Sequence, residues 1–166
     1  MNFEKAFELL IGNEGKLSLD PKDRGNWTSG KVGVGELRGS KYGISAMSYP
    51  LLDIKNLKLS DAHAIYRNDY WHPLFDHLPD DIIFDVFDTS VNSGMSRAVK
   101  LLQKSVGANE DGLLGPQTVA LSKAATNLSS RFNAHRLIFM TNTSMWESQG
   151  KGWARRIAHN LLLNKA

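Results

Sequence analysis

Residues 80–92 read Asp80-Asp-Ile-Ile-Phe-Asp-Val-Phe-Asp-Thr-Ser-Val-Asn92, and this stretch decides the fold class. Its apolar residues recur at the spacing of one helix face, at Ile82, Ile83, Val86, Phe87 and Val91. The pattern predicts a helix that faces a hydrophobic core. Comparable patterns and breaks predict further helices over residues 3–14, 59–72, 95–106, from Pro116 onward, 128–147 and 153–163.

Residues 15–45 differ from the rest of the chain. They hold seven of the 14 glycines and only short apolar alternations, such as Val32-Gly-Val34-Gly. Glycine-rich sequence of this kind favours turns and short strands over helix. We therefore predict a mainly α fold with a small β-hairpin near the N-terminus.

The composition excludes several classes of protein. The chain has 166 residues, a net charge of +3 and no cysteine, which excludes disulfide scaffolds, zinc–thiolate sites and cysteine nucleophiles. No apolar run approaches the roughly 18 residues that span a bilayer. The first residues, Met1-Asn-Phe-Glu-Lys5, lack the pattern of a secretory signal.

Three carboxylates stand close together in the sequence, namely Glu14, Asp20 and Asp23. Glycoside hydrolysis commonly uses one protonated and one ionised carboxyl group. Glu14 continues the apolar face of the first predicted helix and lies at its C-terminal end, where burial and the helix dipole both favour the neutral acid. Asp20 and Asp23 lie in a polar turn beside Lys22. Taken alone, a solvated Glu14 and an ordinary Asp-Pro turn explain the same residues.

Several motifs together resemble glycoside hydrolase family 108, whose members are muramidases found mainly in phage endolysins. The motifs are Asn13-Glu-Gly-Lys16, Asp20-Pro-Lys-Asp23, Lys41-Tyr-Gly-Ile-Ser45, Tyr70-Trp71 and Phe87-Asp-Thr-Ser-Val-Asn-Ser-Gly94. The later segments Ala98–Gln103 and Asp111–Thr118 resemble a peptidoglycan-binding module that accompanies this family. The resemblance implies a lysozyme-like α+β fold. It also implies a catalytic lobe over residues 1–94 and a helical peptidoglycan-binding lobe over 95–166, packed as one compact domain.

The resemblance also implies roles for individual residues. Glu14 matches the family's catalytic acid, and Asp23, or less closely Asp20, would stabilise the transition state or activate water. The family's water-placing threonine corresponds to Ser40 by motif or to Thr28 by spacing. Two departures stand out: Lys16 and Leu17 replace a glycine and a tyrosine, and residues 26–39 form an insertion.

Four further residues are candidates for binding the sugar chain, namely Tyr42, Tyr70, Trp71 and Asn92. Aromatic rings cover the apolar faces of sugars, and an amide both donates to and accepts from an acetamide group. Packing between helices is the competing explanation for Tyr70 and Trp71, and a helix-end cap is the competing role for Asn92.

The predicted function is therefore an endolysin-like muramidase that hydrolyses the β-1,4 bond between N-acetylmuramic acid and N-acetylglucosamine. No His-Glu-x-x-His zinc motif occurs, and we expect neither a metal nor a cofactor. The expected partner is peptidoglycan, and we expect no nucleic acid. For the acid-free segment Lys151–Lys165 two explanations stay open: a terminal helix docked on the core with its basic face in water, which we favour, and a helix that binds anionic outer-membrane lipid. We expect a monomer that stays in the host cytoplasm until a holin-type pore releases it to the periplasm and cell wall. A non-catalytic wall-binding or secretion-accessory protein, and a lytic transglycosylase, remain as alternatives.

Overall fold

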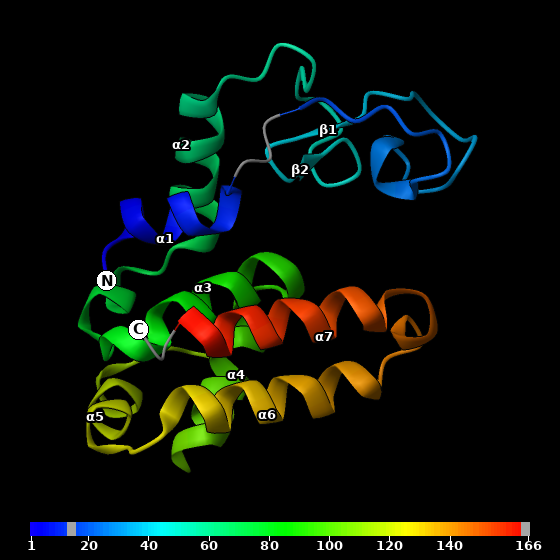
Figure 1. Cartoon of the computed structure of the whole chain (residues 1–166). Coiled ribbons are helices and arrows are strands. Elements are labelled where there is room, and N and C mark those ends of the chain that lie inside the picture. The colour runs from blue at the N-terminus through cyan, green and yellow to red at the C-terminus, as the bar shows by residue number, and fades with distance from the viewer. Residues whose placement is uncertain (13–15, 164–166) are drawn as a thin grey trace. The chain divides into compact units, whose positions relative to one another are not determined.

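The computed structural model describes residues 1–12 and 16–163 (Figure 1). In that part of the chain the fold is mainly α, with seven α-helices and one two-stranded antiparallel sheet. The prediction of a mainly α fold with a small hairpin is confirmed. The helices are α1 (Phe3–Ile11), α2 (Leu59–Tyr70), α3 (Asp80–Ser93), α4 (Met95–Val106), α5 (Pro116–Ala124), α6 (Leu128–Thr141) and α7 (Trp146–Leu163).

The chain divides into two compact units. The helical unit comprises Met1–Ala6 and Tyr70–Ala166, and the loop unit comprises Phe7–Asp69. The predicted catalytic lobe over residues 1–94 and peptidoglycan-binding lobe over 95–166, packed as one compact domain, stay predictions.

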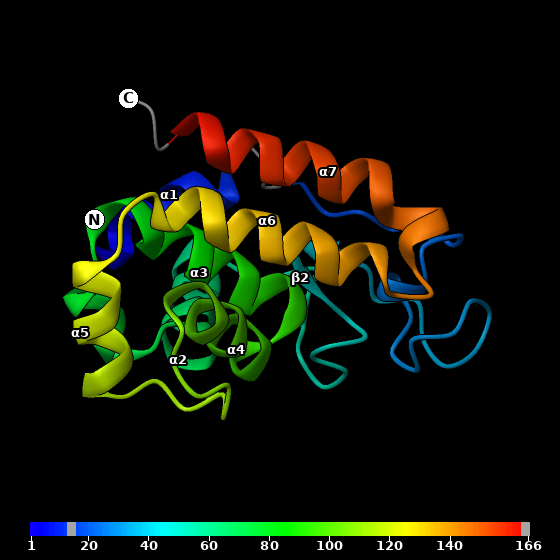
Figure 2. The ribbon, with the colours of Figure 1, turned by 90° about the horizontal axis from the view of Figure 1, so that it is seen from below.

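The core of the helical unit is built around α3. Every residue of α3 from Ile82 to Ser90 is buried, because α4 and α6 both pack against this helix. A helix that is covered on all sides carries apolar residues around its circumference. Helices α6 and α7 lie side by side along this core, as Figures 1 and 2 show.

An aromatic cluster adds to the same core. The Trp71 ring meets Phe3, Phe75 and Phe87 edge to face, with ring centroids 5.2, 5.5 and 5.3 Å away. Phe75 belongs to the short 3₁₀ helix η2 (Pro73–His77). Such edge-to-face pairs satisfy the quadrupoles of the rings and stabilise by more than the area that they bury.

A buried charge network joins α3 to α6 and α7. Asp88 is only 1% exposed, and its Oδ2 lies 2.8 Å from Nη1 of Arg136, which is fully buried. Arg156 donates from Nε to Asp88 Oδ1 at 2.7 Å, and Asn160 donates to Oδ2 at 3.0 Å. Burial by itself raises the pKa of Asp88, but the two guanidinium groups outweigh it and hold this pKa below its ordinary value.

Two predicted helix boundaries are wrong. Helix α1 ends at Ile11 and not at residue 14, because Gly12 takes the left-handed conformation (φ 52°) that ends helices. The predicted break between residues 147 and 153 lies instead between Thr141 and Trp146. Gly150 lies inside α7, where the Trp146 ring fills the space that a Cβ would need, 2.8 Å from its position.

The loop unit has little regular structure. Strands β1 (Ser40–Lys41) and β2 (Ile44–Ser45) pair antiparallel across the two-residue turn Tyr42–Gly43. Both turn residues have positive φ, 52° and 74°, as a type I′ hairpin requires. The unit also contains the 3₁₀ helix η1 (Arg24–Asn26), most of helix α2 and the part of α1 from Phe7 onward. Val32 and Val34 lie in turns, not in a strand.

In the described residues no helix is both long enough and apolar enough to cross a membrane.

Candidate active site

The candidate active site is built on residues 16–23, a loop that runs along the β-hairpin. Ser18 and Ser40 exchange two backbone hydrogen bonds, of 2.8 and 3.0 Å, and so attach the loop to β1. The approach is so close that a Cβ on Gly39 would lie 2.4 Å from the Ser18 carbonyl oxygen. Gly39 also has a φ of 86°, which other residues rarely adopt. This contact fixes the start of the loop that carries Asp20 and Asp23.

The two aspartates share one tight turn and are both exposed. Asp20 Oδ1 accepts a hydrogen bond from the Lys22 amide at 2.9 Å, and Asp23 Oδ1 accepts one from the Gly25 amide at 2.8 Å. The Asp23 amide in turn donates to the Asp20 carbonyl at 3.2 Å. Asp23 thereby caps η1. Both carboxylates are thus oriented by their own backbone, and the structure brings these two predicted residues together.

The side chain of Asn26 supports the turn that carries Asp20 and Asp23. It is fully buried, and its Nδ2 donates to the Asp20 carbonyl at 3.0 Å. The Asn26 carbonyl accepts from the amides of Arg38 and Gly39, both at 3.0 Å. One residue therefore ties the aspartate turn to the segment that leads into β1. The neighbouring Trp27 adds a bond from its indole N–H to the Pro21 carbonyl at 2.9 Å.

The hairpin turn presents Tyr42, a predicted sugar-binding residue. The hydroxyl of Tyr66 on α2 donates to the Tyr42 carbonyl at 3.0 Å, and it would lie 2.6 Å from a Cβ on Gly43. Tyr42 is held at a positive φ of 52°, a conformation of the kind that concentrates at functional sites. The Tyr42 side chain is half-buried, with Lys41 Nζ 5.4 Å from its ring centroid.

The two candidate water-placing hydroxyls lie in different surroundings. Thr28 Oγ1 accepts from the Glu36 amide at 3.0 Å, while the Thr28 amide donates to the Glu36 carbonyl at 3.0 Å. Thr28 thus closes the loop formed by the inserted residues. Ser40 lies on β1, directly after the close contact at Gly39, and is half-buried.

The remaining predicted sugar-binding residues belong to the helical unit. Trp71 is 5% exposed and packs in the aromatic cluster, which is the packing role weighed for it above. The Tyr70 carbonyl accepts from the Ser90 hydroxyl at 2.8 Å. Asn92 is exposed near the end of α3, where its Oδ1 accepts from the Ser93 hydroxyl at 3.2 Å. Sugar contacts by these residues stay predictions.

Glu14, the predicted catalytic acid, lies outside the described residues. Within the described part of the chain, no group of three or more histidine, aspartate or glutamate side chains is placed to hold a metal ion.

A family model described as glycosyl hydrolase 108 matches residues 7–94, which is more than half of the chain. The chain belongs to glycosyl hydrolase family 108. The matched span contains Glu14, Asp20, Asp23 and Tyr42. Membership implies a glycoside hydrolase activity.

A solved structure extends the likeness beyond the family 108 span. The structure of Brucella abortus SagA is similar to this chain, with a TM-score of 0.80 and 27% identity over 98% of this chain and 92% of the SagA chain. The fold similarity therefore includes α4 to α7, which lie outside the glycosyl hydrolase 108 match. No curated protein matches the sequence.

Two residues that position the site were not identified from the sequence. Asn26 and the Tyr66 hydroxyl act through bonds to carbonyl groups of the turns at Asp20 and Tyr42. A carbonyl is present at every residue, so neither bond leaves a motif.

Proposed function

We propose that this family 108 protein is a muramidase that hydrolyses the β-1,4 bond between N-acetylmuramic acid and N-acetylglucosamine in peptidoglycan. The observation that carries the proposal is the aspartate turn inside the family 108 span. Its two exposed carboxylates are oriented by bonds from the Lys22 and Gly25 backbone amides, and the buried Asn26 side chain holds the turn through the Asp20 carbonyl. A carboxylate that must stabilise positive charge gains from such preorganisation.

In the proposed reaction Glu14 protonates the oxygen of the leaving sugar. Asp23, or Asp20 in its place, stabilises the oxocarbenium-like transition state or activates the attacking water. Each of the two aspartate carboxylates accepts a bond from a backbone amide, which fixes its orientation in the turn.

For the water-placing hydroxyl we favour Ser40 over Thr28. The Thr28 hydroxyl is already engaged with the Glu36 amide and would lie 2.6 Å from a Cβ on Gly35. Its bonds therefore support a structural role in the insertion. The backbone of Ser40 is fixed by its two bonds with Ser18, close in the chain to the hairpin turn, and its hydroxyl lies on a half-buried residue of β1.

The endolysin role is a further part of the proposal. Release through a holin-type pore, wall binding by the C-terminal helices and contact with anionic lipid all belong to it. The observation that bears on lipid is the set Lys151, Arg155 and His159, which are exposed at four-residue intervals on α7. Arg156 does not add to this stripe, because it pairs with Asp88.

The test compares wild type with Glu14→Gln on purified peptidoglycan, with mass spectrometry of the soluble products. Reducing N-acetylmuramic ends from wild type and none from the variant are expected. Anhydro-muramic ends would indicate a lytic transglycosylase instead. Binding without release of products by the wild-type chain would overturn the enzymatic proposal in favour of a wall-binding protein.

A further inference from the structure

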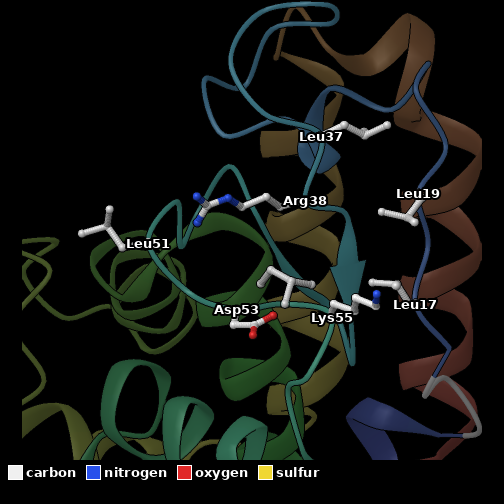
Figure 3. Close-up of a pocket in the computed structure, with 8 residues that line it drawn as sticks. Leu17, Leu19, Leu37, Arg38, Leu51, Asp53 and Lys55 are labelled. Atoms are coloured by element: carbon white, nitrogen blue, oxygen red, sulfur yellow. The ribbon is translucent and has the colours of Figure 1, made fainter.

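The loop unit contains a groove whose walls come from three segments. Its volume is about 500 Å³, within the range of roughly 300–1,000 Å³ that is usual for small-ligand sites. One wall is the segment of Leu17 and Leu19, the second is Leu37 and Arg38, and the third runs from Leu51 to Lys55. Figure 3 shows Leu19 and Leu51 on opposite sides of this view, with Arg38, Asp53 and Lys55 between them.

The groove is continuous with the candidate active site. Leu19 directly precedes Asp20, and Leu37 and Arg38 directly precede Gly39 and Ser40, which contact Ser18 and so attach the loop of the aspartate turn to β1. Leu37 and Arg38 also belong to the insertion of residues 26–39, which therefore builds one wall. The groove therefore shares its walls with the segments that carry and support the aspartate turn.

Exposed leucines contribute apolar surface to the groove. Leu51 is 95% exposed and Leu19 is 49% exposed. Leucine surface of this kind is stabilised when small apolar groups, such as alanine methyls, cover it.

Charged groups of both signs lie within the same groove. Arg38 is held in place by Glu36 Oε2, 2.6 Å from its Nη2, and by a 3.0 Å bond from Nη1 to the Pro50 carbonyl. Asp53 accepts from Asn56 Nδ2 at 2.9 Å, and this bond keeps the pKa of Asp53 below its ordinary value. Lys55 stands two residues further along. The groove thus offers cations to a carboxylate and an anion to an amine.

The geometry points to a binding site for the peptide stem of peptidoglycan, a short peptide with alanine methyls, carboxylates and, where the stem carries a diamino acid, a free amine. The leucines cover the methyls, Lys55 and Arg38 face carboxylates, and Asp53 faces the amine. This inference rests on the proposed function, because the stem is joined to the muramic acid residue at the cleaved bond. It assigns to the 26–39 insertion a role in recognising stem-bearing glycan.

The test measures binding by isothermal titration calorimetry with two soluble probes. One is N-acetylglucosaminyl-N-acetylmuramic acid carrying the tripeptide L-alanyl-γ-D-glutamyl-diaminopimelate, and the other is the same disaccharide without peptide. Wild type is expected to bind the peptide-bearing probe about tenfold more tightly, which is the effect of a few apolar contacts and one screened ion pair.

Variants and matched controls locate the effect. Lys55→Gln and Leu51→Ser are each expected to weaken binding of the peptide-bearing probe by about threefold to fivefold. Lys58→Gln and Leu162→Ser remove an exposed lysine and an exposed leucine elsewhere, and are expected to bind it as wild type does. Thermal melting confirms that each variant is folded.

The outcomes separate this inference from the proposed function. Equal affinity of wild type for the two probes, with peptidoglycan still hydrolysed, overturns the stem site alone. Equal losses in the groove variants and the controls overturn it as well. Binding of neither probe, together with no hydrolysis, overturns both proposals.

Discussion

The helical unit and the loop unit are stabilised by different means. In the helical unit, α3 is buried on all sides, and its buried Asp88 is paired with Arg136 and Arg156. In the loop unit, the aspartate turn is exposed and depends on backbone bonds, a glycine contact at Gly39 and one buried amide, Asn26. The comparison shows that the core determines the fold, whereas a small set of polar contacts determines the orientation of the proposed catalytic carboxylates.

The largest expected effect comes from breaking the charge network of the helical unit. Asp88→Ala leaves Arg136 buried without its carboxylate, which costs about 3–5 kcal/mol of the free energy of unfolding. Urea unfolding followed by circular dichroism measures this. Asp81→Ala removes an exposed carboxylate from the same helix and should change stability by less than about 0.5 kcal/mol. Equal effects of the two variants would refute the role of the network.

Acid should remove part of the same stabilisation. The folded-state pKa of Asp88 lies below its ordinary value of 3.8, so its contribution is present above that value and is lost as pH falls through the lowered pKa. Asp85 on the same helix has a raised pKa because it is buried, so its contribution to stability increases as the pH falls. Wild type should therefore lose more stability than Asp88→Asn between pH 5 and pH 2, measured by urea unfolding at each pH. Parallel curves would contradict this.

In the loop unit, substitution of Gly39 is expected to disrupt the contact between β1 and the loop of residues 16–23. Gly39→Ala imposes both a positive φ and a Cβ 2.4 Å from the Ser18 carbonyl, for a cost of about 2–4 kcal/mol. Gly33→Ala is the matched control, because its φ is also positive, 76°, but nothing lies within 4 Å of the added Cβ. Hydrogen exchange over residues 16–23 should rise in the first variant much more than in the second.

Removal of the buried Asn26 amide tests whether the orientation of the aspartate turn affects activity as well as stability. Asn26→Ala leaves the Asp20 carbonyl without its side-chain donor, which costs about 1–3 kcal/mol. Hydrolysis of peptidoglycan should fall at least tenfold, because the aspartate turn loses its orientation. Asn68→Ala, which removes an exposed amide of the same unit, serves as the control. Unchanged hydrolysis in a folded Asn26→Ala protein would contradict the positioning role.

The smallest expected effect separates the two hydroxyls. Ser40→Ala should lower kcat about tenfold with little change in melting temperature, since it removes only the proposed water contact. Thr28→Ala should instead lower the melting temperature, because the Glu36 amide loses its acceptor. Kinetics and thermal melting of both variants decide between them, and the reverse pattern would assign the water to Thr28.

Much of the scaffold was predictable from the sequence because burial imposes periodicity. The stripe from Ile82 to Val91 predicted α3, and Gly107 with φ 72° ends α4 as expected. The boundary between α6 and α7 was not predictable, because Gly150 breaks a helix in general but here makes room for the Trp146 ring. The contact between Gly150 and the Trp146 ring does not follow the hydrophobic periodicity from which helices are predicted.

The carboxylates of the candidate site were predictable from the sequence, but the residues that hold them in place were not. Asp20 and Asp23 form a motif, whereas Asn26 acts on a backbone carbonyl and Gly39 acts by lacking a Cβ. Trp71 could not be assigned from the sequence for another reason. An aromatic residue in a family motif is compatible both with binding a sugar and with packing in the core. The structure packs it against three phenylalanines.

The most direct test of the central claim follows the oxygen of the attacking water. Peptidoglycan is digested in ¹⁸O-labelled water, the products are reduced at once with borohydride to prevent exchange, and the muramic ends are analysed by mass spectrometry. Hydrolysis predicts label in each new reduced N-acetylmuramic end from wild type and no new ends from Glu14→Gln. Unlabelled anhydro-muramic ends from the wild-type protein would contradict the account.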